Sequence, residues 1–426
     1  MVFPKNLSFY GRYAFRRQLP AEVFNTFGAD TVLLGQFVLT RIFQPKPWET
    51  TLLFSLMHLS FFLSPWFAER MRGRSTTRLF HFMFLLAVLP LVGTAFTRGF
   101  WGVGPALVLA NIAFVSLFVP LRNRLLRANY HDWERGRCYA AFKSTSAAVY
   151  FGCALWAAFE LEANPQRIHV ILPTAGILAG IGILIFSRIR ERGQGKRIRG
   201  DDERRRRGFK DVYRDLFELY RTQRAFFLFQ VGFFIYGMGF MFTMPREMDM
   251  VGSVLKLDYP LIVLGIYGVT PLVKMTCIRI FGNLLDRAGP CILSSVAFLL
   301  LVAYPLGVFL ALQFASPILW LVARGAFGFA MAGVDVAWSV GPLSFGPREQ
   351  APRYTAAHIF AVGIRASIGP TLGHLVSLVA GSGVFLAAAG LLTGASLFMR
   401  RLARGACAHL DGRKKGDREH NGAPGE

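Results

Sequence analysis

The chain alternates between long apolar runs and short stretches rich in basic residues. Because about 20 apolar residues are enough for a helix to cross the hydrocarbon core of a bilayer, each run can form one membrane span. The pattern predicts twelve spans, at residues 20–43, 47–68, 77–97, 100–120, 138–160, 168–188, 224–245, 258–281, 290–313, 317–341, 355–378 and 383–402. We therefore expect an all-α polytopic membrane protein with two six-helix pseudo-repeats.

The polar segments divide this chain into five parts. We expect a cytoplasmic N-terminal tail or interfacial helix at 1–19 and a six-helix bundle at 20–188. A basic cytoplasmic linker follows at 189–223, then a second six-helix bundle at 224–402 and a basic disordered cytoplasmic tail at 403–426. Within the linker, residues 209–220 have helical periodicity, which favours an amphipathic helix lying on the membrane surface.

The composition supports a membrane protein and argues against several other classes. Of the 426 residues, 53% are hydrophobic and 17% are charged, too little charge for the surface of a soluble protein of this length. The five cysteines lack the spacing of a metal site or a disulfide framework, and we expect neither a metal nor a cofactor. The first residues lack a short apolar core, so we expect no cleavable signal peptide.

The net charge of +23 could indicate a nucleic-acid partner, but its distribution favours another interpretation. The basic residues gather in alternate loops and in the tails, as expected where positive charge sets the orientation of membrane helices. This asymmetry predicts that both termini lie in the cytoplasm, with the chain in the plasma (inner) membrane. The run Arg204–Arg207 would contact anionic lipid, and we expect no nucleic-acid partner and a monomer.

A motif with two adjacent charges separates the spans at 258–281 and 290–313. Gly282 is expected to let the helix end pack closely, and Asp286 and Arg287 form a charge pair at a membrane face. Gly289 and Pro290 are expected to break one helix and open the next. The stretch from Phe281 to Pro290 is therefore predicted to be a tight loop between two spans.

This loop resembles the signature loop of the major facilitator superfamily, Gly-x-Leu-x-Asp-Arg-x-Gly-Arg. It matches at Gly282, Leu284, Asp286, Arg287 and Gly289, and departs at Pro290, where the family usually has arginine. A weaker copy contains Glu69–Arg70, 217 residues earlier, with Pro65 where glycine is expected. Arg137–Ala141 and Arg353–Ala357 repeat at an offset of 216 residues, which supports an internal duplication.

The resemblance implies a fold and a mechanism. Two six-helix halves would enclose a central cavity lined by helices 1, 4, 7 and 10, and would rock about a site at mid-membrane depth. The cytoplasmic gate loops would latch the outward-facing state through Glu69, Arg70, Asp286 and Arg287. The missing glycine at position 65 weakens this expectation for the first loop.

Polar residues within the predicted spans are the candidate site, because a charge at membrane depth needs a partner or a water-filled cavity. The first span has a one-sided polar stripe with Asp30 near its middle: Glu22, Asn25, Thr26, Asp30, Gln36 and Thr40. Further candidates lie on other spans: His58, Asn111, Gln230, Arg324, Asp335 and Arg365. His358 lies seven residues before Arg365, on the same helical face.

Several interpretations of these residues stay open. His58 is either a hydrogen-bonded packing histidine or a proton relay, and the resemblance would bring it towards Arg365. Asp30 and Arg365 are too deep for their charges to reach the headgroups, so each is functional or part of a structural ion pair. Asp335 could instead hold a cytoplasmic loop in place.

The sequence therefore predicts a secondary transporter, a symporter or antiporter, and not an enzyme. Cationic candidates (Arg324, Arg365, Lys274) outnumber acidic ones (Asp30, Asp335), which favours a small organic anion as substrate, with Asp30 as proton carrier. One alternative is a non-transporting sensor or assembly protein with the same fold. A membrane-embedded acyltransferase is disfavoured because no cluster of His, Asp and Ser gathers at one membrane face.

Overall fold

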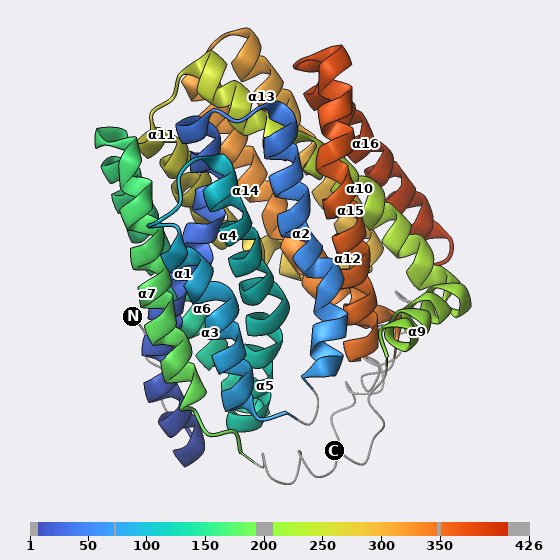
Figure 1. The fold of residues 1–426 in the computed structure, drawn as a ribbon. Helices are drawn as coiled ribbons and strands as arrows, with labels where there is room; N and C mark the ends of the chain where they lie inside the picture. The colour runs from blue at the N-terminus through green and yellow to red at the C-terminus, as the bar shows by residue number, and fades with distance from the viewer. Residues whose placement is uncertain (1–6, 72–73, 193–207, 347–350, 408–426) are drawn as a thin grey trace. The chain divides into compact units, whose positions relative to one another are not determined.

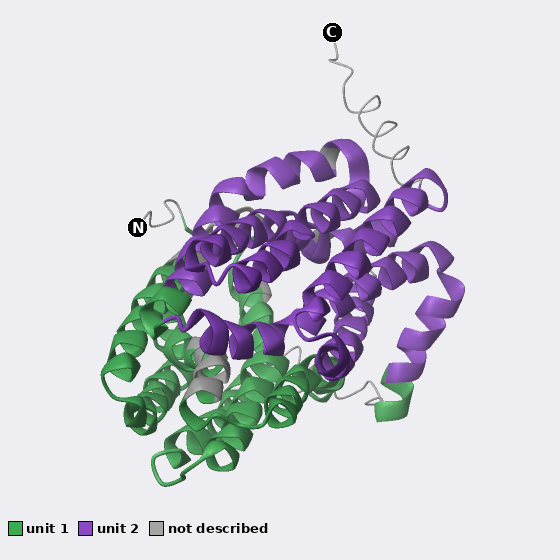
Figure 2. Ribbon diagram, turned by 90° about the horizontal axis from the view of Figure 1, so that it is seen from above, with its two compact units in different colours: residues 1–212, 258–263 green, residues 213–257, 264–426 purple. Residues whose placement is uncertain are grey.

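The computed structural model describes residues 7–71, 74–192, 208–346 and 351–407, and these residues form helices joined by short connections (Figure 1). The chain divides into two compact units, which Figure 2 colours separately. Unit 1 comprises residues 1–212 and 258–263, and unit 2 comprises residues 213–257 and 264–426. The expectation of an all-helical protein is confirmed for the described residues.

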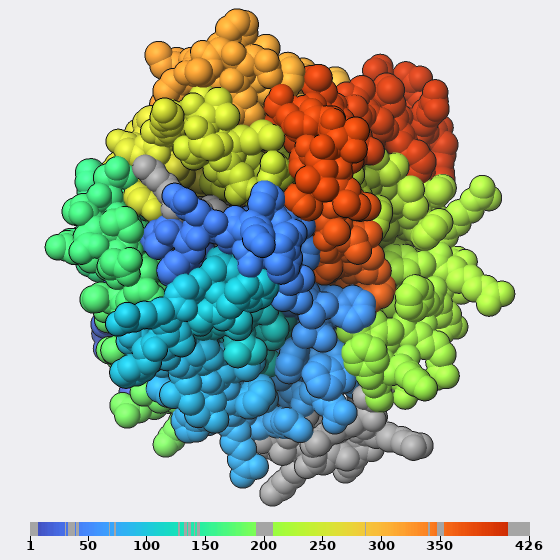
Figure 3. All heavy atoms as spheres, turned by 45° about the horizontal axis from the view of Figure 1, so that its top comes forward, coloured from blue at the N-terminus to red at the C-terminus, as the bar shows by residue number. Residues whose placement is uncertain are grey.

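Unit 1 contains the N-terminal helices. In chain order they are α1 (Phe9–Phe43), α2 (Pro47–Arg70), α3 (Thr76–Gly93), α4 (Phe100–Ile112), the π-helical η1 (Ala113–Phe118), α5 (Val119–Asn129), α6 (Asp132–Ala163), η2 (Pro165–Arg167), α7 (Ile168–Ser187) and α11 (Tyr259–Val263). Helix α7 packs against both α1 and α3, and α2 packs against α4 and η1. Helix α4 also contacts α3, and the space-filling view shows the packed surface of this part of unit 1 (Figure 3).

Unit 2 contains the C-terminal helices. They are α9 (Phe209–Thr222, whose first residues belong to unit 1), α10 (Arg224–Met250), η3 (Val251–Leu255), η4 (Leu264–Val269), α12 (Thr270–Leu301), α13 (Ala303–Gln313), α14 (Pro317–Val340), η5 (Gly341–Phe345), α15 (Ala351–Ala380) and α16 (Gly383–Arg404). Helix α10 packs against both α15 and α16, and α12 packs against α14.

Ten helical stretches of the described chain are long and apolar enough to cross a membrane. The remaining two predicted spans, 20–43 and 138–160, lie within α1 and α6, which have 35 and 32 residues. Large apolar side chains are exposed on helices of both units, for example Leu85 of α3 at 56%, Ile318 of α14 at 73% and Leu378 of α15 at 67%. Such exposure is costly in water but not in hydrocarbon, so the chain is an integral membrane protein.

The N-terminal segment differs from the expectation of a separate tail at 1–19. Helix α1 begins at Phe9 and continues without interruption into the first predicted span. Its first turn is held by Glu134 of α6, whose carboxylate accepts hydrogen bonds from the backbone N–H and the hydroxyl of Ser8, both at 2.8 Å. The described part of this segment therefore extends α1 as a helix with one buried face, which includes Ala14, Phe15 and Gln18.

The predicted linker helix at 209–220 is confirmed as α9, but it packs on protein. Its buried residues Tyr213, Leu216 and Leu219 lie on one face, and Tyr213 contacts the ring of Phe360 on α15 at 5.2 Å. The hydroxyl of Tyr220 donates to the carbonyl of Ala357 at 2.5 Å. This contact with α15 was not predicted from the sequence, and the position of α9 at the membrane surface stays a prediction. The Arg204–Arg207 run lies outside the described residues, as does the tail from 408 onward.

The signature loop is more helical than the sequence predicted. Helix α12 continues through residues 281–288, and the chain breaks at Gly289, with φ 75° and ψ 174°. The predicted role of Gly289 and Pro290 is therefore confirmed, whereas the separate loop is wrong. The predicted packing role of Gly282 is also wrong, because a Cβ at this position would meet no atom within 4 Å. The side chain of Asp286 lies outside the described residues, and that of Arg287 is exposed.

Candidate functional site

The most unusual charge in unit 2 is Arg365, halfway along α15. Its side chain is 4% exposed, and its NH1 group donates to the backbone carbonyl of Phe233 on α10. The guanidinium also lies over the rings of Phe233 and Tyr236, at 5.9 and 5.3 Å from their centroids. Within the described part of the chain, no carboxylate pairs with Arg365, and its Nε has no hydrogen-bond partner. A buried cation without an acidic partner is costly, which suggests a role beyond stability.

Gly237 on α10 provides the space for this side chain. A Cβ at position 237 would clash with both Cδ and Nε of Arg365. Helices α10 and α15 lie side by side (Figure 1). Glycine is required here for the close approach of a side chain to the backbone.

Replacing Gly237 by alanine is expected to lower the free energy of unfolding by about 1–3 kcal/mol, because the added methyl group displaces Arg365 from a packed position. The matched control is Gly390→Ala on α16, where a Cβ would meet no atom within 4 Å. The control should be neutral or slightly stabilising. Thermal unfolding of the purified full chain in detergent measures both. Equal unfolding midpoints for the two variants would contradict the close contact.

His358 lies two helical turns before Arg365 and contacts another predicted site residue. Its Nδ1 is 2.8 Å from Oε1 of Gln230 on α10, and both side chains are buried, at 1% and 4% exposure. The imidazole is enclosed by the rings of Phe233 at 5.1 Å and Trp338 at 5.4 Å. The second polar atom of each side chain, Nε2 of His358 and Nε2 of Gln230, has no hydrogen-bond partner among the described residues. The structure thus groups Gln230, His358 and Arg365 along one α10–α15 contact.

Arg324 has a partner that the sequence analysis missed. Its NH2 group lies 3.4 Å from Oε2 of Glu247, and the two side chains are 6% and 2% exposed. The hydroxyl of Tyr304 and the indole N–H of Trp320 also donate to the Glu247 carboxylate, the latter at 2.9 Å. Glu247 was overlooked because the predicted span ended at residue 245, whereas α10 and η3 continue to Leu255.

Asp335 forms a different and more exposed ion pair. Its carboxylate lies 2.8 Å from Nζ of Lys274 on α12, and the side chains are 39% and 35% exposed. A pair with this exposure is screened by solvent and contributes about 1 kcal/mol at most. Because Asp335 and Lys274 pair with each other, neither is an unpaired charge available to a substrate in unit 2.

The candidates on helices 2 and 4 pack within unit 1. Asn111 donates to the carbonyl of Met57 at 2.6 Å and to the hydroxyl of Ser60 at 3.2 Å. Nδ1 of His58 lies 2.7 Å from the carbonyl of Phe54 in its own helix. Both side chains are thus used in packing between or within helices. The predicted approach of His58 to Arg365 concerns the two separate units and stays a prediction.

The polar stripe of α1 is described only in part. Glu22 lies 3.7 Å from NH1 of Arg122 and accepts a hydrogen bond from Gln18 at 3.3 Å. Asn25 is buried, and its Oδ1 has no hydrogen-bond partner among the described residues. The side chains of Asp30 and Gln36 lie outside the described residues, so their roles stay predictions.

The first gate loop is fastened inside unit 1 by residues that the sequence analysis did not single out. Arg124 of α5 donates from NH1 to the carbonyls of Met71 and Arg74, at 3.3 and 3.2 Å. Its other nitrogens contact Glu191, with NH2 at 2.8 Å. The predicted gate residues are arranged differently: Glu69 is buried, and Arg70 lies over the ring of Trp66 at 5.4 Å.

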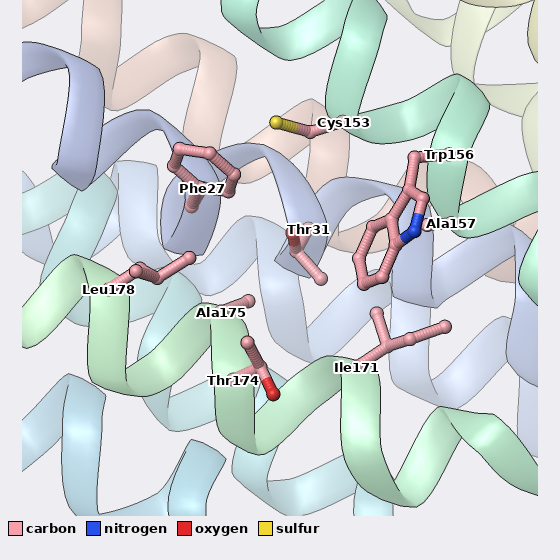
Figure 4. Close-up of a pocket in the computed structure, with 9 residues that line it drawn as sticks. All are labelled: Phe27, Thr31, Cys153, Trp156, Ala157, Ile171, Thr174, Ala175 and Leu178. Atoms are coloured by element: carbon pink, nitrogen blue, oxygen red, sulfur yellow. The ribbon is translucent and has the colours of Figure 1, made fainter.

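Unit 1 also contains a cavity of about 260 Å³ between α1, α6 and α7 (Figure 4). Its lining is apolar apart from two threonines and a cysteine, and includes Phe27, Thr31, Cys153 and Trp156. None of the predicted site residues lines it, so we do not assign the site here. Among the described residues, no group of three or more His, Cys, Asp or Glu side chains could hold a metal ion.

Comparison with known proteins shows likeness in structure but not in sequence. No family model matches the sequence, and no curated protein matches it. The nucleoside transporter NupG superimposes with a TM-score of 0.68 at 11% identity, covering 91% of this chain and 99% of NupG. A POT family transporter in complex with 5-aminolevulinic acid gives 0.69 at 12% identity, covering 93% and 97%. A bacterial homologue of the human lysosomal transporter Spinster gives 0.63 at 12% identity, covering 94% and 98%.

Proposed function

The chain has the fold of major facilitator superfamily transporters, and we propose that it is a secondary transporter. It would move a small organic anion across the membrane by alternating access. Twelve membrane helices form two six-helix halves, with both termini in the cytoplasm. The charge pairs Glu69–Arg70, at the end of α2, and Asp286–Arg287, just before the break in α12, latch the outward-facing state. The solved neighbours are transporters of different solutes, so the substrate class must be argued from the residues of this chain.

The observation that carries the anion proposal is the position of Arg365. It lies at the fifteenth of the 30 residues of α15, where its charge is far from either end of the helix. Within the described chain, Arg324 is paired with Glu247 and Lys274 with Asp335, whereas Arg365 has no acidic partner. A guanidinium offers two parallel donors that match a carboxylate, so an anionic substrate would supply the missing counter-charge.

Uptake into liposomes containing the purified full chain tests this proposal. The probes are radiolabelled benzoate and acetate as anions and tetraethylammonium as a cation. We expect uptake of a carboxylate above that of protein-free liposomes, and no uptake of the cation. Uptake of the cation alone would overturn the anion proposal. Absence of uptake for all three probes would favour the alternative of a non-transporting membrane protein.

A further inference from the structure

We propose that His358 takes up a proton when a carboxylate binds at Arg365, so that the α10–α15 contact is a joint site for one monocarboxylate and one proton. This inference rests on the proposed anion transport and specifies its coupling. The sequence predicts Asp30 of α1 as the proton carrier. The described structure instead provides a histidine beside the buried cation, with a defined hydrogen-bond partner.

The tautomer of His358 follows from its contact with Gln230. The amide oxygen Oε1 can only accept a hydrogen bond, and it lies 2.8 Å from Nδ1 of the imidazole. Nδ1 therefore carries the hydrogen, and in the neutral ring Nε2 has only a lone pair. This Nε2 is buried and has no hydrogen-bond partner in the described chain. Neutral His358 thus presents an acceptor where an anion needs a donor.

Helices α10 and α15 contact each other at two positions that are equally spaced along both helices, one at the imidazole of His358 and one at the guanidinium of Arg365. Gln230 and Gly237 are seven residues apart on α10, as are His358 and Arg365 on α15. Gln230 contacts His358, and Gly237 contacts Arg365, with Phe233 in contact with both α15 side chains. Seven residues span two turns, about 10 Å. Long side chains on a helix lean towards its N-terminus, so Arg365 extends towards His358.

Three buried polar atoms along this α10–α15 contact have no hydrogen-bond partner among the described residues: Nε of Arg365, Nε2 of Gln230 and Nε2 of His358. The first two are donors that a carboxylate can accept from. The third becomes a donor only when the ring is protonated. Binding a carboxylate together with a proton satisfies this atom, because the protonated ring donates from Nε2 to the same carboxylate that offsets the buried charge of Arg365.

The walls of the site favour a monocarboxylate with an apolar body. The ring of Trp338 lies 5.4 Å from the imidazole, and Tyr236 lies 5.3 Å from the guanidinium carbon. Both rings, together with Phe233, are apolar surface within reach of a bound ligand. Sulfate has no apolar part that could pack against these rings, so we expect it to bind more weakly than benzoate. We therefore choose benzoate as the probe and sulfate as the comparison.

Several other titratable groups around α15 are engaged or lie at helix ends, and His374 lies sixteen residues beyond His358 on the same helix. Tyr236 of α10 and Tyr220 of α9 face Arg365, and the hydroxyl of Tyr220 is bonded to Ala357. Asp335 of α14 is paired with Lys274, and Arg353 at the start of α15 with Asp215. Arg400, Arg401 and Arg404 of α16 are exposed at its last turns. His358 is therefore the titratable group that an anion at Arg365 would affect most directly.

Calorimetric titration of benzoate into the purified full chain tests the proposal. Repeating it in buffers with different heats of ionisation counts the protons taken up. We expect uptake approaching one proton per benzoate where the free imidazole is neutral, and a Kd that rises about tenfold per pH unit in that range. In His358→Gln, proton uptake and the pH dependence of Kd should both disappear. The matched control is His374→Gln, further along α15, which should keep both.

The outcomes separate this inference from the proposed function. Benzoate binding without proton uptake by the wild-type chain would overturn the inference and leave anion transport intact. Uptake retained in His358→Gln and lost in Asp30→Asn would return the proton to Asp30 and also overturn it. Proton-linked binding without transport in liposomes would support the joint site and overturn the proposed function. Binding of sulfate as tight as that of benzoate, or no binding of either anion, would overturn the site. An unchanged unfolding midpoint shows that His358→Gln is folded.

Discussion

Replacing Arg365 by glutamine is expected to abolish carboxylate uptake and to weaken benzoate binding by about 100-fold or more. The charge-assisted hydrogen bonds of one guanidinium contribute about 1.5–3 kcal/mol each, and two of them would be lost. Arg365→Lys keeps the charge but not the planar pair of donors, so it should retain only part of the affinity. Liposome uptake and calorimetric titration measure the two effects.

The same substitution should not destabilise the protein, and this separates a binding role from a structural one. Arg365 is 4% exposed and has no acidic partner among the described residues, so removing its charge relieves a desolvation cost. We expect an unfolding midpoint for Arg365→Gln equal to or above that of the wild-type chain. A marked fall in the midpoint with normal benzoate uptake would contradict the assignment and show that the arginine is structural.

Replacing Glu247 by glutamine, unlike Arg365→Gln, is expected to destabilise the protein, lowering the free energy of unfolding by about 3–5 kcal/mol. Glu247 and Arg324 are almost fully buried, and removing one charge of such a pair leaves the other uncompensated. The substitution also disturbs the acceptor for Tyr304 and Trp320. Thermal or denaturant unfolding of the purified chain in detergent measures the loss.

Two further variants test this interpretation of the buried pair. The double variant Glu247→Gln with Arg324→Gln should recover part of the stability, because neither charge is then unpaired. The matched control is Asp335→Asn, which breaks a pair whose side chains are more than a third exposed and should cost about 1 kcal/mol or less. Equal losses for Glu247→Gln and Asp335→Asn would contradict the expected effect of burial.

The sequence predicted the helical spans well because their signal is local. Each apolar run is long enough to identify itself, and each of the twelve predicted ranges falls mainly on helix, although the range 77–97 continues past the end of α3 at Gly93. The end of the seventh span was misplaced because Arg246 and Glu247 resemble the start of a loop. In the structure, Glu247 is inside α10 and paired with Arg324, 77 residues away in sequence. A charge pattern indicates depth, but it does not identify a partner on another helix.

The candidate site could be predicted residue by residue but not as an arrangement. Gln230 and Arg365 were singled out because polar side chains at membrane depth are costly, and both are buried. Their relation through His358 and Phe233 depends on the register of α10 against α15, which no local pattern encodes. Gly237 gave no signal, because a glycine in an apolar helix has several explanations. Gly282 shows the reverse error: a motif glycine was assigned a packing role, yet it faces open space.

Counterflow in liposomes tests the central claim, carriage of an organic anion by alternating access, most directly. Liposomes with the purified full chain are loaded with unlabelled benzoate and diluted into a trace of labelled benzoate. We predict transient accumulation of label above equilibrium in wild-type liposomes and none with Arg365→Gln, because a carrier exchanges substrate between two exclusive openings. Label that only equilibrates in wild-type liposomes, or accumulation that survives in Arg365→Gln, would contradict the account.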